Sequence, residues 1–91
     1  MGFTQDSAVE RAKKDLAGRL GIDEADIQRS VAESDFPDMA LGAPEPGEMA
    51  AQMISSGWQI DLIVDGKTYE YRADKYQLRL HNFAGKNYVI E

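Results

Sequence analysis

The chain has 91 residues, of which 43% are hydrophobic and 29% charged, and its formal net charge is −6 at pH 7. This balance predicts one globular domain with a modest core and argues against nucleic acid or an anionic membrane as a partner, because both require a basic surface. The lack of cysteine excludes disulfides, thiol catalysis and thiolate metal sites. With no bilayer-spanning apolar run and no signal-peptide pattern, we expect a cytoplasmic protein.

The first predicted element is an amphipathic helix over residues 8–20. Ser7 and Glu10 fit a capping box at its start, with the serine as N-cap. Gly21 is the natural residue to end the helix. Residues 1–6 are expected to form a disordered N-terminus. The apolar residues of the helix recur at the three- and four-residue spacing of a buried face, and they are Val9, Ala12, Leu16, Ala17 and Leu20.

The middle of the chain carries weaker signals. Residues 27–36 are ambiguous, because Ile27 and Val31 have helical spacing whereas alternation suits a strand less well. Three prolines and two glycines follow in residues 36–47, and such a loop is difficult to bury. Residues 48–55 predict a short second helix. Its apolar residues are Met49, Ala50, Met53 and Ile54.

The best-specified stretch is a β-hairpin over residues 57–73. Asp65-Gly66 lies between two runs rich in β-branched and aromatic residues, and this dipeptide tolerates the positive φ angles of a type I′ turn. A two-residue loop places Asp61 opposite Glu70. The same register gives the pairs Val64–Lys67, Leu62–Tyr69, Ile60–Tyr71 and Trp58–Ala73. Because side chains alternate, these four pairs share one face, and its core residues are Trp58, Ile60, Leu62, Val64, Tyr69 and Tyr71.

A third strand follows, with Leu78 and Leu80 on the core face in either of two registers. A two-residue turn would place Arg79 opposite Glu70, and a four-residue turn would place it opposite Arg72. Residues 85–86 can turn the chain again and add a short last strand. If that strand is exposed, it permits a weak homodimer through edge pairing, although nothing in the sequence requires more than a monomer.

Several of these motifs together resemble a small bacterial domain family of uncharacterised function. They are the helix at residues 8–22, the loop at residues 41–47 with the sequence Leu-Gly-Ala-Pro-Glu-Pro-Gly, a Gly-aromatic strand at residues 57–60 and a Tyr-x-Tyr strand at residues 69–71. Many relatives have Cys where this chain has Ala43, with a second Cys near the end of the meander, in a pattern that resembles a disulfide of exported proteins. Relatives also tend to have His where this chain has Arg72.

The resemblance implies a helix packed on an antiparallel sheet, and it implies a strand over residues 27–36, which we adopt. It supplies no established activity and therefore no functional residues. The predicted fold is a single α+β domain, in which the N-terminal helix packs on an antiparallel sheet of three to five strands. A Pro/Gly loop and a short second helix complete it.

No constellation of residues predicts catalysis, and we expect a protein that is not an enzyme and has no cofactor. His81 is the only histidine, and a nucleophilic triad is not available to it, so we expect an exposed side chain. The acids that flank the loop offer an alternative function, a small-ligand or divalent-cation site, although their spacing does not match an EF-hand. These acids are Asp35, Asp38, Glu45 and Glu48.

The most informative feature for function is the set of apolar residues in and beside the proline-rich loop. If they are exposed, they form an apolar patch of the kind that marks partner surfaces. If they are buried, they cap the open end of the core. The leading hypothesis is a module that binds an unknown protein or peptide through residues 37–47 and the neighbouring methionines. Its candidate residues are Phe36, Met39, Leu41, Pro44, Pro46, Met49 and Met53.

Overall fold

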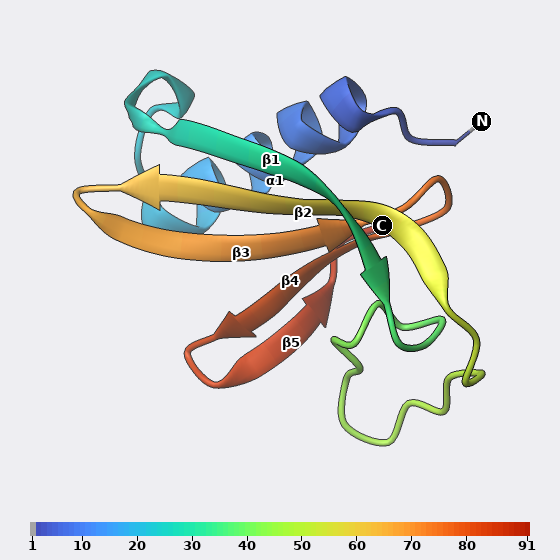
Figure 1. Ribbon diagram of the computed structural model, residues 1–91. Coiled ribbons are helices and arrows are strands. Elements are labelled where there is room, and N and C mark those ends of the chain that lie inside the picture. The colour runs from blue at the N-terminus through green and yellow to red at the C-terminus, as the bar shows by residue number, and fades with distance from the viewer. Residues whose placement is uncertain (1) are drawn as a thin grey trace.

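A computed structural model describes residues 2–91 and confirms the α+β fold. One helix lies across one face of a five-stranded antiparallel sheet whose strands follow chain order (Figure 1). The elements are α1 (Gln5–Leu20), a 3₁₀ turn η1 (Glu24–Asp26), β1 (Gln28–Phe36), β2 (Ser55–Val64), β3 (Lys67–Ala73), β4 (Leu78–Phe83) and β5 (Lys86–Val89). Neither helical element within residues 2–91 is long and apolar enough to cross a membrane.

The start of α1 lies one turn earlier than predicted. Thr4 is the N-cap, and its hydroxyl accepts from the Ser7 N–H while the Ser7 hydroxyl accepts from the Thr4 N–H. The prediction of Ser7 as N-cap is therefore wrong, because Ser7 occupies the third helical position of the box. Within the stretch predicted to be disordered, the Phe3 N–H donates to the Lys75 carbonyl at 2.8 Å and the Phe3 ring packs against the core. Met1 lies outside the described residues.

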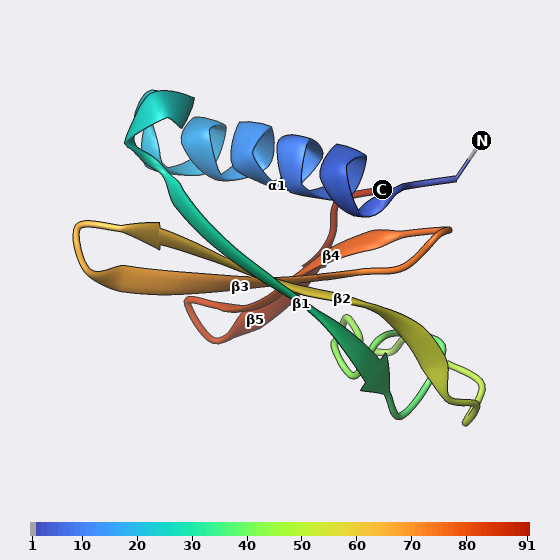
Figure 2. The ribbon, with the colours of Figure 1, turned by 45° about the horizontal axis from the view of Figure 1, so that its top comes forward.

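The main core lies between α1 and the sheet (Figure 2). The Tyr71 hydroxyl crosses this layer and donates to Asp15 Oδ2 at 2.7 Å, and Arg19 Nε donates to the same oxygen at 2.7 Å. Burial and the bond to Asp15 raise the pKa of Tyr71, so the phenol remains a donor. The fully buried apolar side chains of this layer are Ala8, Val9, Ala12, Leu16, Ile60, Leu62, Tyr71, Ala73, Leu78 and Leu80.

The predicted register of the first hairpin is confirmed at every pair, including Asp61 opposite Glu70. The second turn has four residues, so Arg79 lies opposite Arg72. Asp74 explains this choice, since its Oδ1 accepts from the N–H groups two and three residues later, at 2.8 and 3.0 Å. The longer turn thus follows from a side-chain acceptor at its first residue.

The strand over residues 27–36 is confirmed as β1, and the short last strand as β5, although its turn is Ala84-Gly85 rather than Gly85-Lys86. The predicted second helix is wrong, because residues 48–54 have no regular secondary structure. Their backbone has other partners. The Ala51 carbonyl, for example, accepts from the Met39 N–H across the loop at 2.9 Å.

Candidate interaction surface

Residues 37–54 connect β1 to β2 and form the longest irregular stretch of the described chain. They lie below one end of the sheet in Figure 2, on the face opposite α1. We call residues 37–47 the proline loop and residues 48–54 the exposed segment. The proline loop is attached to the sheet by specific bonds, and the exposed segment carries three of the four large apolar side chains of this stretch that are exposed.

Asp38 organises the first corner of the proline loop. Its Oδ1 accepts from the N–H groups of Ala40 at 2.9 Å and Gly42 at 3.0 Å. Leu41 and Gly42 then adopt left-handed φ angles of 57° and 65°, and the Leu41 side chain is fully buried. A carboxylate that satisfies two nearby N–H groups stabilises such a turn without a regular ladder. The corner is therefore held by its own local sequence.

Arg72 on β3 anchors this corner to the sheet. Its Nη1 donates to the Leu41 carbonyl at 2.9 Å, its Nε pairs with Glu70 at 2.6 Å, and its guanidinium lies 5.5 Å from the centre of the Phe36 ring. A Cβ at Gly42 would lie 2.7 Å from Nη1. Glycine suits this position, because it adopts the left-handed φ angle without strain and leaves room for the guanidinium.

Arg79 on β4 anchors the other end of the proline loop. The residue is 5% exposed, and its two terminal nitrogens bind the Glu48 carboxylate at 2.5 and 2.7 Å. Nη1 also donates to the Ala43 carbonyl at 3.2 Å, and Nε to Gln77 Oε1 at 2.7 Å. The hydrogen bonds from Arg79 and the Glu45 N–H lower the pKa of Glu48 to about 2. The carboxylate is therefore charged at neutral pH.

Three further bonds extend the attachment. Gln77 Nε2 donates to the Met39 carbonyl at 2.6 Å, and Asn87 Nδ2 donates to the Pro44 carbonyl at 2.9 Å. The Val89 N–H of β5 donates to Glu45 Oε2 at 3.2 Å. The proline loop thus reaches the last strand, so the edge at which the sequence permitted a homodimer is partly covered.

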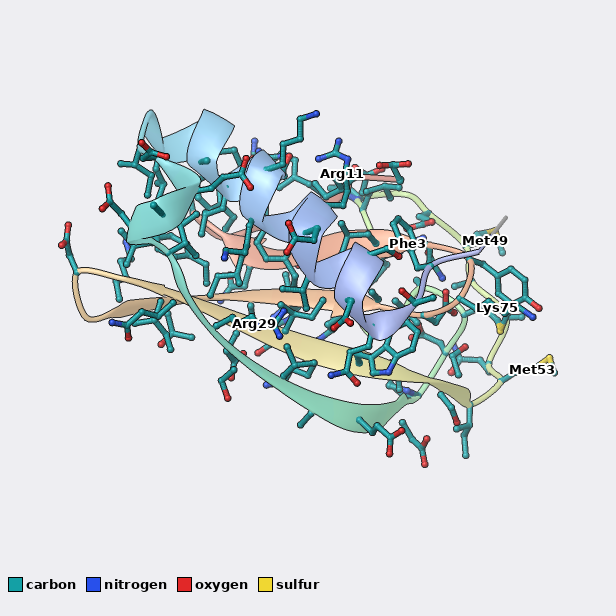
Figure 3. All side chains as sticks on the ribbon, turned by 90° about the horizontal axis from the view of Figure 1, so that it is seen from above. Phe3, Arg11, Arg29, Met49, Met53 and Lys75 are labelled. Carbon is teal, nitrogen blue, oxygen red and sulfur yellow. The ribbon has the colours of Figure 1, made fainter. Side chains whose placement is uncertain are left out.

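Four large apolar side chains of the proline loop and the exposed segment are exposed. Met49 is 97% exposed, Ile54 76%, Met53 63% and Met39 40%. Met49 and Met53 extend away from the sheet at one end of the molecule (Figure 3). We call these four residues the methionine patch. It is joined to the sheet at Met39, whose Sδ accepts from the Ser55 hydroxyl at 3.2 Å.

The candidate residues therefore divide into two groups. Phe36 and Leu41 are buried, so their assignment to an exposed binding surface is corrected: they hold the loop from inside. The other group is exposed or nearly so, and consists of Met39, Pro44, Pro46, Met49 and Met53. The sequence analysis did not include Ile54 in the binding surface. Ile54 directly precedes β2, and alternation along the strand points its side chain away from the side on which Ser55 is buried.

The four acids of the alternative site do not converge. Asp38 and Glu48 bind the groups described above, Glu45 binds the β5 backbone, and Asp35 Oδ1 accepts from the Ser56 hydroxyl at 2.8 Å. No group of three or more His, Cys, Asp or Glu side chains in residues 2–91 is arranged to hold a metal ion. His81 lies opposite Glu70, with Nδ1 3.6 Å from Oε2 and the side chain 29% exposed.

Comparison with protein-family models identifies a relationship for this chain. None of the curated proteins and none of the solved structures compared with the chain matches it. A family model described as "Domain of unknown function (DUF8738)" matches residues 9–81. This range begins in α1, includes the proline loop and both anchoring arginines, and ends in β4. The chain therefore belongs to the DUF8738 family of domains of unknown function.

Proposed function

We propose that this domain is a non-enzymatic interaction module whose methionine patch binds an apolar segment of a protein partner. The observation that carries the proposal is the exposure of Met49, Met53 and Ile54 on one short segment, beside a loop that is otherwise attached closely to the sheet. Large apolar side chains that are exposed together on one short segment are a feature of interaction sites.

The attachment of the proline loop supports this proposal. Arg72 and Arg79 bind the carbonyls of Leu41 and Ala43, and Glu48 is paired at the point where the exposed segment begins. A partner therefore meets a segment that is held at Glu48, at the Ala51 carbonyl and at the start of β2, which lowers the entropic cost of ordering it on binding.

The side chains of the patch suit an apolar partner segment. Methionine is unbranched and polarisable, so it adapts to partners of different shape. Full burial of each such side chain is worth about 1.5–3 kcal/mol, so the patch can supply a substantial part of a binding free energy. Because the chain has a net charge of −6, the partner segment is expected to carry basic residues beside its apolar ones.

The experiment is site-specific photo-crosslinking in native extract, with benzoylphenylalanine replacing Met53 in one protein and Glu10, on the exposed surface of α1, in the control. A defined protein should be cross-linked from position 53 only, and Met49→Ser in the same chain should abolish the adduct. The cross-linked segment is then synthesised and titrated calorimetrically. Combined Met49→Ser and Met53→Ser should weaken its binding at least about tenfold, which corresponds to 1.4 kcal/mol.

Two results would contradict the proposal. Adducts of equal yield from positions 53 and 10 would show non-specific contact. A titrated segment that binds the double serine variant as tightly as the wild type would place the interaction elsewhere on the domain.

A further inference from the structure

The two edges of the sheet differ in what covers them. β5 has four residues, and the Val89 N–H binds Glu45 from the proline loop. β1 has nine residues, and each of them is paired with β2 on one side. On its other side, no backbone segment of residues 2–91 lies beyond β1, which forms the outer border of the sheet in Figure 3. A long uncovered edge is a template for another strand.

The register of the sheet identifies the backbone groups at this open edge. In a two-residue hairpin, the backbone groups of Val64 and Lys67 form hydrogen bonds with each other. Successive residues of a strand direct their N–H and C=O groups to opposite sides, so those of Ile63 point toward β1. Ile63 lies opposite Gln28, so the even-numbered residues of β1 bond to β2. The odd-numbered residues from Arg29 to Asp35 therefore direct their N–H and C=O groups outward. In agreement with this, the Ile27 N–H binds the Glu24 carbonyl instead of β2.

The side chains at this edge are self-complementary. The segment from residue 29 to residue 33 reads Arg-Ser-Val-Ala-Glu, with opposite charges at equal distances from Val31. Arg29 and Glu33 are both exposed, and neither forms a salt bridge within residues 2–91, whereas every other arginine does. They cannot pair with each other along the strand, because four residues of β-strand separate them by roughly 13 Å.

We propose that β1 pairs with β1 of a second copy of this chain, antiparallel about a two-fold axis at Val31, so that one sheet continues through both copies. In this register Arg29 of each copy lies opposite Glu33 of the other, and the two Val31 side chains meet. A two-fold axis brings each residue against its symmetry equivalent, so a self-complementary strand is what such an interface requires. The surface and the occupant differ from those of the methionine patch.

The test is sedimentation of the full chain at concentrations from about 10 μM to about 1 mM. The wild type should shift from the 10.1 kDa monomer toward twice that mass. Arg29→Glu alone, or Glu33→Arg alone, should raise the dimer dissociation constant at least about tenfold, because each creates two like-charge contacts in the symmetric pair. An equimolar mixture of these two single variants should dimerise again, because every cross-strand contact then joins opposite charges.

The matched control is Asp65→Asn at the distal hairpin turn, which should dimerise as the wild type does. Circular dichroism of each variant establishes that it is folded. A wild type that remains monomeric throughout the range overturns the proposal and leaves β1 to a strand of another protein. A dimer that is insensitive to both charge reversals, or single variants that fail to associate when mixed, overturns the register centred on Val31. None of these changes touches the methionine patch, so the two proposals fail independently.

Discussion

The two faces of the sheet are covered in physically different ways. The face toward α1 is apolar and excludes water over a continuous core that includes Leu16 and Leu62. The opposite face, under the proline loop, is held by Arg72 and Arg79, which bind loop carbonyls and carboxylates. Apolar burial is non-directional and roughly proportional to area, whereas the arginine contacts depend on individual donors and acceptors.

This difference predicts different sensitivities for the two faces. On the α1 face, losses should scale with the volume removed. On the loop face, single polar substitutions should release a specific segment while the sheet persists. Two arginines directly opposite each other would repel, and the structure resolves this by giving each its own acid, Glu70 for Arg72 and Glu48 for Arg79.

The largest expected effect is on the α1 face. Leu62→Ala should lower the free energy of unfolding by about 2–5 kcal/mol, because the side chain is fully buried in the main core. Urea titration followed by circular dichroism measures this loss. Leu41→Ala is the matched comparison, since Leu41 is equally buried but lies outside the main core cluster. A smaller loss would show that the loop opens separately, and an equal loss that loop and sheet unfold as one unit.

The next effect is on the loop face. Arg79→Met should cost about 1.5–3 kcal/mol, because a charged bidentate pair and a bond to the Ala43 carbonyl are removed together. Hydrogen exchange should accelerate at the Ala43 and Glu48 amides and remain slow in β2. Arg29→Met is the control, with an expected change within about 0.5 kcal/mol in monomeric protein, because the Arg29 side chain is exposed. Uniform acceleration across the sheet would contradict a local role for Arg79.

The third effect is a pH dependence of the loop face in acid. Folding lowers the pKa of Glu48 from its ordinary 4.5 to about 2, so its contribution is complete above pH 4.5 and is lost as the pH falls toward 2. The loop amides should lose exchange protection over this window. Glu48→Gln should remove this component and leave the acid sensitivity of the remaining carboxylates. An unchanged profile in the variant would show that the Arg79 pair does not stabilise the loop.

The smallest effect is expected on the outside of the loop. Combined Met49→Ser and Met53→Ser should change the free energy of unfolding by no more than about 0.5 kcal/mol, because both side chains are already exposed. Thermal melts of the variant and the wild type measure this. A loss comparable to that of Leu62→Ala would identify the methionines as core and remove the basis for the interaction surface.

Local patterns predicted the helix, the first hairpin and the α+β class correctly. The apolar stripe of the helix, which includes Leu16, and the turn at Asp65-Gly66 both depend on residues close together in the sequence. Both are present in the structure. The wrong predictions concern segments whose local pattern favours one structure while groups far away in the sequence bind them in another. Residues 48–54 have helical spacing, yet Glu48 is bound by Arg79, which is 31 residues away along the chain. The Ala51 carbonyl, which a helix would pair with the N–H four residues later, instead accepts from the Met39 N–H across the loop.

The candidate surface was predicted in part for the same reason. Composition identified an apolar, proline-rich stretch, but it could not distinguish Leu41, which Asp38 and Arg72 place inside, from Met49, which nothing covers. Asp38 itself was read only as a possible cation ligand. In the sequence, an Asp that precedes a glycine by four residues is a signal of a turn capped by a side chain, and this signal could have been recognised. The structure shows that turn, with left-handed φ angles at Leu41 and Gly42.

The sequence by itself therefore determined the amphipathic helix, the two-residue hairpin turn and the buried faces of β2, β3 and β4, because periodicity and turn chemistry act between near neighbours. Only the tertiary structure decided the side chains that the proline loop buries and the sheet edge that stays open. These depend on which distant groups satisfy one another. Arg72 and Arg79 bind loop carbonyls that are 31 and 36 residues away along the chain, so a pattern of near neighbours cannot predict these bonds.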